Sequence, residues 1–536
     1  MLKKADKQAS FIDTDYICER LVPQDSFYRK FKELVAPLIK DEDFDSMYCK
    51  DNGRPPISPS LLAMACILQF YRRLSDREME RACMFDIEIK YALDIGIDNR
   101  PFDHSSLGDF RERLLKNGKE KEIFERILGH LVEKGLVKRD EIQRIDATHV
   151  IADIAIPTMV TMIKKGMYEI LKILKNRYKN IYDVIAEEIE VSEYSKGQVN
   201  KDAPGRFDLE KRKKKLVEVV INAKTLLLHM DFLGMDDGLQ HRVDMLRQIL
   251  QENIKRDKDG NVVEMERKER PPDIIVSPID PDARFGAKSK TKKFYGYKAN
   301  VTETVESRFI TNIKPMPGNM HDGNITSEMV LEQKYHDITP KKLIGDAAYS
   351  PAVHRHKLHE NGTRVIAPTH AKNDRSKKVL PKSMSKYNDR THSLTCPKGV
   401  TTRRQWGDYD LTRDVVTYHF PVTACRKCSL KKKCTNASCG RRIVGISRWD
   451  KVLLKAEKYN KTEAFKKDMK LRQPIEGKLS EMKRYHGMVR ARYRGLRKVG
   501  LQFYLTATAV NIKRWLSNIL EKVKPKNAST LPAVCG

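Results

Sequence analysis

The feature that most constrains the fold is a change of hydrophobic period near residue 141. Residues 141–154, EIQRIDATHVIADI, alternate around β-branched side chains and predict a strand. The next strand-like text is FYGYKANVTET at 294–304, and with SRFITNIKPMPG at 307–318 it predicts a hairpin. Helix, strand, helix and strand patterns then follow in that order at 321–337, 341–347, 350–362 and 363–369. Strands and helices that alternate in this way indicate an α/β core.

The text on either side of this core divides the chain into further units. The 536 residues exceed one ordinary domain, and roughly 150 residues per domain predicts three or four units. Long helical, charged text and a cysteine-bearing stretch interrupt the core. We expect a helical N-terminal domain at 1–140, a core at 141–154 plus 271–370, a helical insertion at 155–270, a cysteine-containing insertion at 371–450, and C-terminal helices at 451–522.

The N-terminal domain contains several short helical patterns. Residues 58–74 form one of them, and Ser75-Asp-Arg-Glu78 has the form of a capping box that starts the next. A further helix is expected near Ser105 and Ser106. Short helices rich in arginine fit a helix-turn-helix DNA binder, and they fit a plain helical bundle with a solvated charged face equally well.

The charge balance points to a polyanionic partner. Lys and Arg outnumber Asp and Glu by 103 to 72, which gives a net charge of +31 and predicts nucleic-acid binding rather than a merely basic surface. Residues 483–498, KRYHGMVRARYRGLRK, hold seven of these cations and no acid, which is typical of a phosphate-binding surface.

The longest apolar run, 61–68, is far too short for a membrane span, and the N-terminus has no apolar signal core. We therefore expect a soluble intracellular protein.

Two aspartates lie within or at the end of strand-like text in the core. Asp146 lies within QRIDATH, and Asp346 ends KKLIGD. Carboxylates of this kind can hold Mg²⁺, the ion that phosphodiester chemistry needs. Taken singly, each residue is better explained as a cap or turn aspartate.

A third acid lies near the C-terminus. Arg472, Glu476 and Lys483 are spaced to share one helical face, where two cations keep the carboxylate ionised. An ordinary surface ion pair has the same spacing, and Pro474 indicates that the helix starts only near that residue.

Four cysteines have metal-ligand spacing. Cys396 precedes Cys425-x2-Cys428-x5-Cys434, and such a set of thiolates suits a structural Zn²⁺ in tetrahedral coordination. Cys439 is left over. Free thiols in a loop are the alternative.

The spacing Arg472-x3-Glu476-x6-Lys483 resembles the Y-x2-R-x3-E-x6-K signature of bacterial insertion-sequence transposases of the DDE class. The blocks IDATH at 145–149, DPDARFGAK at 280–288, FYGYKANV at 294–301, PGNMHDG at 317–323 and GDAAYS at 345–350 are similar to that family as well. The leader, with SPSLLAMACILQFYRRL and FDHSSLGDFRERL, resembles the InsH-like helical domain of these proteins. One position departs from the pattern, because Met469 stands where the signature has tyrosine.

The resemblance implies an RNase H-like core in which Asp146, Asp346 and Glu476 form the catalytic triad and bind two Mg²⁺ ions. It also implies a cysteine block before the catalytic glutamate. The weaker candidates for the acidic site are Asp153, Asp280, Asp282, Asp322 and Glu481. The residues expected to bind DNA are Arg472, Lys483, Arg484, Arg490, Arg492, Arg494, Arg497 and Lys498.

On this reading the chain is a transposase that cuts the ends of an insertion sequence and joins them to target DNA. Its partners would be the terminal repeats, the target DNA and a second copy in a homodimer, and its place would be the bacterial cytoplasm near the nucleoid. Two other functions fit the same residues. One is an RNase H-like nuclease that cuts without joining, and the other is a non-catalytic DNA-binding protein derived from a transposase.

Overall fold

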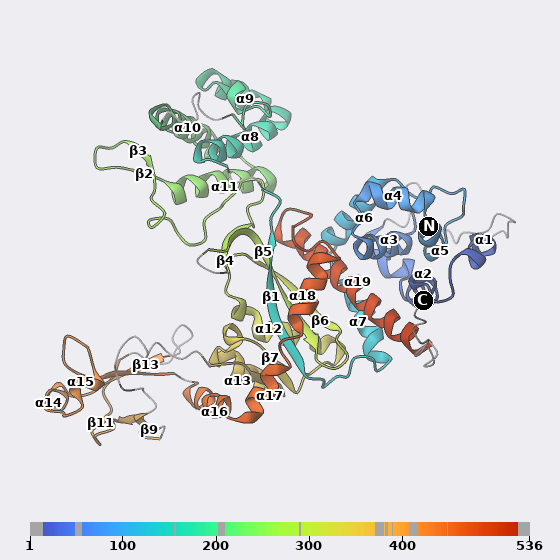
Figure 1. Cartoon of the computed structure of the whole chain (residues 1–536). Coiled ribbons are helices and arrows are strands. Elements are labelled where there is room, and N and C mark those ends of the chain that lie inside the picture. The colour runs from blue at the N-terminus through green and yellow to red at the C-terminus, as the bar shows by residue number, and fades with distance from the viewer. Residues whose placement is uncertain are drawn as a thin grey trace, which may run out of the picture.

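The computed structural model describes residues 14–48, 56–154, 157–201, 209–288, 291–369, 380, 384–388, 390–406, 415–447 and 449–523. A mixed sheet lies at its centre, with helical bodies and a cysteine-bearing region around it (Figure 1). Among the described residues, no helix is both long enough and apolar enough to span a membrane.

The central sheet has six strands in the order β4-β5-β1-β7-β8, with β6 paired to β5. Strand β1 is antiparallel to β5 and parallel to β7, and β7 is parallel to β8. The predicted strand and hairpin are confirmed, since they correspond to β1, β5 and β6. The bounds are β1 Gln143–Ile151, β4 Arg284–Ala287, β5 Lys293–Thr304, β6 Ile310–Pro317, β7 Lys342–Ile344 and β8 Arg364–Ile366.

Helices cover both faces of the sheet because its strands are apolar on both sides. Ile145 and Leu343 pack in one cluster with residues of α12 (Thr326–Leu331) and α13 (Ala352–Glu360). Val150 packs in another with residues of α18 (Ile475–Arg484) and α19 (Leu496–Val523). The helical segment predicted at 321–337 is confirmed, and it consists of α12 with a 3₁₀ turn on either side, Asp322–Ile325 and Glu332–His336.

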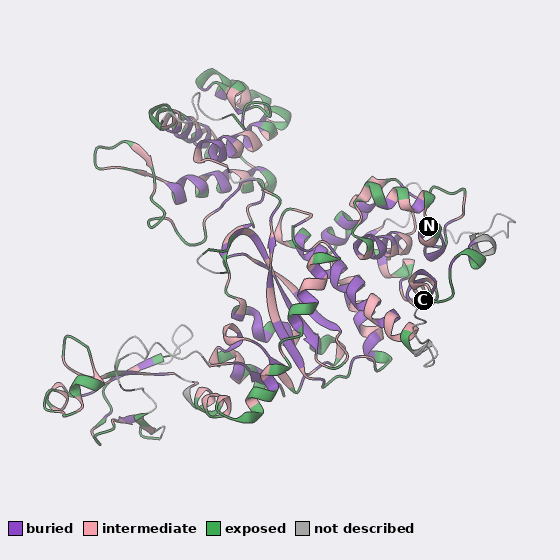
Figure 2. Cartoon of the chain, viewed as in Figure 1, coloured by how far each residue is buried: buried purple, intermediate pink, exposed green. Residues whose placement is uncertain are grey.

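The N-terminal helices and α19 pack in the larger of these two cores. The middle of α19 is buried (Figure 2). The capping box is confirmed: the Ser75 hydroxyl accepts from the Glu78 amide at 3.3 Å, and the Glu78 carboxylate accepts from the Ser75 amide at 2.7 Å. The helices are α1 Thr14–Leu21, α2 Phe27–Lys30, α3 Pro59–Arg72, α4 Asp76–Phe85, α5 Ile87–Ala92, α6 His104–Lys116 and α7 Glu122–Glu133.

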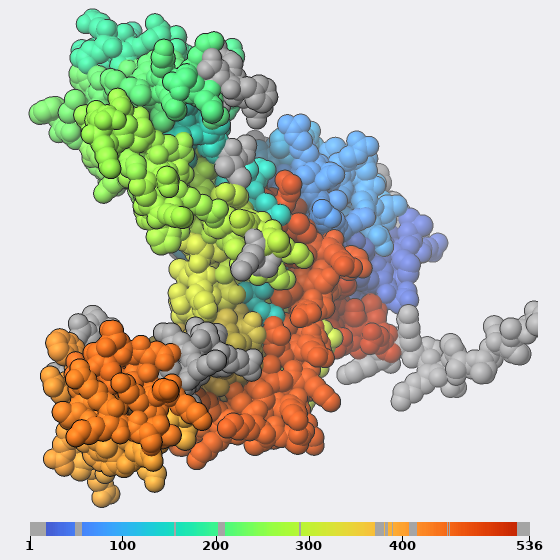
Figure 3. Space-filling view, turned by 60° about the vertical axis from the view of Figure 1, so that its left-hand side comes forward, coloured from blue at the N-terminus to red at the C-terminus, as the bar shows by residue number. Residues whose placement is uncertain are grey.

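The segment between β1 and β4 forms a separate helical body with its own buried core. It consists of α8 Met159–Arg177, α9 Lys179–Glu188, α10 Leu209–Met230 and α11 Asp237–Asn253, followed by a hairpin of β2 Ile254–Arg256 and β3 Val262–Glu264. These helices bury their apolar faces against one another. The helical body and the cysteine-bearing region both extend away from the sheet (Figure 3).

The cysteine-bearing region contains two small three-stranded sheets, ordered β11-β10-β9 and β12-β13-β14. Its elements are β9 Lys386–Asn388, β10 Ser393–Thr395, β11 Thr401–Thr402, β12 Gln405–Trp406, β13 Val415–His419, α14 Val422–Arg426, α15 Lys431–Cys434 and β14 Ile443–Ser447. Helices α16 (Asp450–Asn460) and α17 (Glu463–Lys470) then lead back to α18.

Candidate active site

Asp146 lies on β1, and Asp346 follows the end of the neighbouring parallel strand β7 by two residues. Arg144 pairs with Ile344, the last residue of β7, and the same register continued by two residues would set Asp146 opposite Asp346. Paired strands lie about 4.8 Å apart, and residues directly opposite one another point to the same face. The Asp346 carboxylate also caps a 3₁₀ turn by accepting from the Ala348 amide at 2.8 Å. The strand register therefore brings together the two acids that the sequence singled out.

The surroundings of Asp146 are anionic. Burial raises the pKa of its carboxyl group, the Arg472 guanidinium opposes that effect, and the nearby Asp346 and Asp322 raise the pKa further. Arg472 donates to the Asp146 carboxylate at 2.8 Å. Arg472 and Lys298, which pairs with Asp322, supply two positive charges to three carboxylates, so the site favours an added cation.

Asp322 is a further carboxylate close to Asp146. It begins the 3₁₀ turn Asp322–Ile325, and its carboxylate accepts from Lys298 at 2.8 Å. Buried Tyr349 lies within the electric field of Asp322, Asp146 and Asp346, which together with burial raises its pKa. The only sequence signal was the position of Asp322 in PGNMHDG.

Glu476 lies in the first turn of α18 and is exposed. The prediction that it shares a helical face with Arg472 is wrong. Pro474 is the N-cap, so Arg472 lies in the turn that precedes the helix. This turn contacts β1 through the Arg472–Asp146 ion pair, so α18 starts beside the strand that carries Asp146. Among the described residues, none forms an ion pair with the Glu476 carboxylate.

Positive charge gathers around the end of β1. The pKa of His149 is lowered to about 4 by burial and by the ammonium groups of Lys483, Lys288 and Lys292. Burial and Lys288 also lower the pKa of Lys483. A phosphate at this position would relieve the repulsion among these cations.

The basic run continues along the same strand end. The Ile151 amide donates to the Val489 carbonyl at 3.0 Å, and the Ala491 amide donates to the Ile151 carbonyl at 2.7 Å. Arg490 therefore lies beside β1. Arg484 and Arg490 are exposed, and their guanidinium groups form no ion pair within the described part of the chain.

Other cations of the run bind the protein itself. The Arg492 guanidinium lies 4.6 Å from the centre of the Phe70 ring. Arg497 pairs with Glu120 and Lys498 with Glu112, each at 2.9 Å, and Arg494 lies 3.6 Å from Asp153. Several residues that the sequence assigned to DNA thus connect α19 and the preceding loop to other parts of the protein.

Three of the weaker acidic candidates also have partners within the protein. Buried Asp280 accepts from Tyr297 and from the Gly495 amide, and Asp282 accepts from the Leu496 amide at 2.8 Å. Glu481 pairs with Lys513 at 2.8 Å. These contacts account for the three carboxylates without a metal.

Cys396, Cys425, Cys428 and Cys434 line one cavity of about 30 Å³, and all four are free thiols. Cys439 is exposed. No three of these four sulfur atoms all lie within 4.8 Å of one another, so the cluster is looser than a closed zinc site.

Within the described ranges, the group of three possible metal ligands whose atoms all lie within 4.8 Å of one another is Glu80, Asp103 and His104. Arg100 pairs with both of those acids, which identifies an ion-pair cluster.

Two family models match the chain. A transposase DDE domain matches residues 395–516, which include the cysteine cluster, Glu476 and the basic run. A second transposase domain, DUF772, matches residues 16–113, which span α1 to α6. No curated protein and no solved structure matches the chain. The matched ranges do not include Asp146 and Asp346.

The lowered pKa of His149 predicts a pH-dependent stability. In the unfolded chain the imidazole has its ordinary pKa of 6.5, whereas in the folded protein the pKa is about 4. The unfolded state therefore binds the proton more readily, and stability falls as the pH decreases from about 6.5 towards 4. A His149→Gln variant should lose less stability over this window than the wild type. Urea unfolding at several pH values measures the difference, and parallel curves for the two proteins would contradict the assignment.

Proposed function

The chain belongs to the insertion-sequence transposases of the DDE class, and from this premise we propose that it cuts DNA at the ends of its element and transfers the strands to target DNA. Asp146, Asp346 and Glu476 are the proposed catalytic carboxylates. The observation that supports the proposal best is the parallel pairing of β1 with β7, together with the electrostatic influence of Asp346 on Asp146.

An RNase H-like core is part of the proposal. It is supported by a mixed sheet in which antiparallel β6, β5 and β1 continue into parallel β7 and β8, with helices on both faces. The α18 helix packs against this sheet, and that supports Glu476 as the third acid.

The donor set fits Mg²⁺. Carboxylate oxygens are the ligands that this ion prefers, and the field of Asp346 and Asp322 at Asp146 is one that a divalent cation would relieve. Asp146 and Asp346 would hold the metal, with Glu476 as the ligand from α18. Two bound Mg²⁺ ions would supply an activated nucleophile and stabilise the departing oxygen.

The protein's own residues would then orient the DNA. Lys483, Arg484 and Arg490 would hold phosphates at the end of β1, and Arg472 would keep the Asp146 carboxylate in position. Water would attack the phosphorus at the element end and free a 3′ hydroxyl, which would attack a target phosphodiester in the same manner. Two element ends need two sites, so a homodimer on DNA is proposed as well.

Removing each catalytic carboxylate tests the proposal. Asp146→Asn, Asp346→Asn and Glu476→Gln should each reduce Mg²⁺-dependent cleavage of DNA that carries the element's ends by on the order of 10³-fold, because the metals lose a ligand. DNA affinity should stay close to that of the wild type. Asp322→Asn is the matched control and should retain cleavage. An inactive Asp322→Asn beside an active Glu476→Gln would show that the third acid is misassigned.

Salt dependence tests the DNA surface. If Arg484 and Arg490 each neutralise one phosphate, changing either to Ala should lower the slope of log K against log salt by about one, on any DNA sequence. Arg497→Ala is the matched control, because that residue already pairs with Glu120. Fluorescence anisotropy at several salt concentrations gives the slopes. Unchanged slopes for Arg484→Ala and Arg490→Ala would rule out this surface.

A structural Zn²⁺ held by Cys396, Cys425, Cys428 and Cys434 completes the proposal. Four thiols around one cavity of about 30 Å³ fit the donor set of such a site. The metal would hold the two small sheets of this region together.

Metal analysis checks the zinc proposal. Purified protein should contain about one zinc per chain. Cys428→Ser should lose it, while Cys439→Ser should keep it, because Cys439 lies outside the cavity lining. Zinc-free protein, or loss of zinc in Cys439→Ser, would contradict the assignment.

A further inference from the structure

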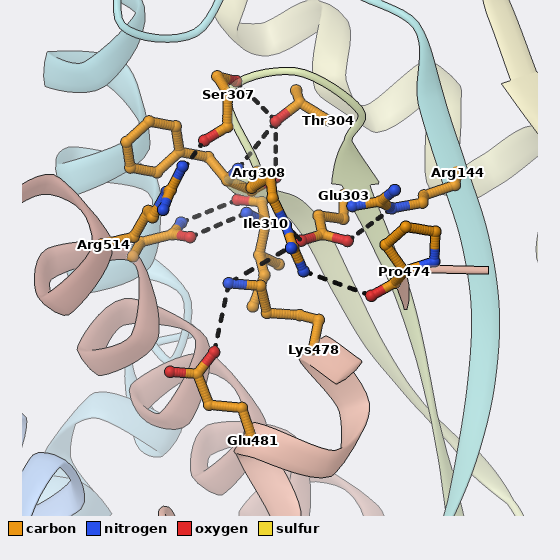
Figure 4. Close-up of polar contacts among 12 residues, drawn as sticks. Arg144, Glu303, Thr304, Ser307, Arg308, Ile310, Pro474, Lys478, Glu481 and Arg514 are labelled. Atoms are coloured by element: carbon orange, nitrogen blue, oxygen red, sulfur yellow. Dashed lines mark hydrogen bonds and ion pairs between the residues drawn. The ribbon is translucent and has the colours of Figure 1, made fainter. Parts of the chain in front are cut away.

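Glu303 is a fully buried carboxylate surrounded by cations from three parts of the chain. It lies on β5 where a β-bulge interrupts the pairing with β6, and its exposed fraction is 0%. Its oxygens lie 2.7 Å from Arg144 on β1, 3.3 Å from Arg308 and 3.9 Å from Lys478 on α18 (Figure 4). A buried charge of this kind persists only when it is paired.

Both arginines held by Glu303 reach the turn before α18. Arg144 donates to the Leu471 carbonyl at 2.9 Å. Arg308 donates to the Pro474 carbonyl at 3.3 Å (Figure 4). These two carbonyls bracket the turn that contains Arg472. Glu303 is the shared acceptor that orients the two guanidinium groups, so the position of the turn depends on this carboxylate.

Lys478 extends the network along α18. Its ammonium group is buried, which lowers its pKa, and it lies near Glu303 and also 3.4 Å from Glu481. Glu481 in turn pairs with Lys513 of α19. The first two turns of α18 are therefore connected to the sheet on one side and to α19 on the other.

We propose that Glu303 is a positioning residue for the active site. Through Arg144 and Arg308 it holds the 471–474 turn against the sheet, and this sets both the Arg472 contact to Asp146 and the place where α18 presents Glu476. The inference rests on the proposed catalytic role of Glu476. It assigns a function to a charge that would otherwise be only a buried ion pair.

Glu303→Gln tests this role because it removes the charge and keeps the shape. We expect faster amide hydrogen exchange in the 471–476 segment, where the Glu476 amide donates to the Gln473 carbonyl. The rate of single-turnover cleavage should fall by on the order of 10²-fold, the loss that a misplaced catalytic group causes. DNA affinity should be unchanged, because Glu303 lies outside the DNA surface.

Two further variants separate positioning from general stability. Glu306→Gln removes an exposed carboxylate on the same hairpin, paired with exposed Lys138, and should match the wild type. Arg308→Asn removes the contacts to Glu303 and Pro474 near the surface. Asn tolerates the positive φ of 62° at this position, so the variant should fold even where Glu303→Gln does not. It should show the same two effects as Glu303→Gln, to a smaller degree.

The outcomes distinguish this inference from the proposed function. Normal exchange at 471–476 and wild-type cleavage in both Glu303→Gln and Arg308→Asn would overturn the positioning role and leave the transposase proposal intact. Uniformly faster exchange across the whole core would overturn it as well, because Glu303 would then be a general stabiliser. If the wild type does not cleave, the proposed function fails, and the exchange measurement still decides whether Glu303 holds the turn.

Discussion

The parallel pairing of β1 with β7 is the constraint on which the candidate site depends. Arg144 lies opposite Ile344, and the Asp346 carboxylate, two residues beyond the end of β7, is close enough to raise the pKa of Asp146. A shift of one residue in either strand would send one carboxylate to the opposite face. The apolar neighbours prevent that shift, because Ile145 and Leu343 are buried under the helices on the other side of the sheet.

The negative charges of the grouped aspartates repel one another and need nearby cations. These cations come from parts of the chain that are distant in sequence. Arg472 comes from the turn before α18 and Lys298 from β5, and each forms an ion pair with one of the grouped aspartates. Glu303 performs the opposite task inside the protein, since it is an anion that gathers cations. The acidic site and the buried network meet in the 471–474 turn, which explains how a helix far along the chain is held against the first strand.

The sequence predicted the strands, the hairpin and the capping box because each depends on local patterns. It also selected Asp146 and Asp346, since acids within or just after strand-like text are visible in the sequence. It did not predict the closeness of Asp322 or the burial of Glu303, because both result from contacts between distant elements. The basic run was taken as one DNA surface, yet Arg492, Arg497 and Lys498 contact the N-terminal part of the chain. Charge counting cannot separate cations that bind DNA from cations that join parts of the protein.

The central claim is that Asp146, Asp346 and Glu476 share one metal site. Iron-directed cleavage of the polypeptide measures this directly: Fe²⁺ replaces Mg²⁺, and hydroxyl radicals made at the bound ion cut the nearby backbone. The account predicts cuts near residues 146, 346 and 476 that excess Mg²⁺ suppresses. Cuts near 146, 346 and 322 with none near 476 would contradict it, since the third ligand would then come from the 3₁₀ turn and not from α18.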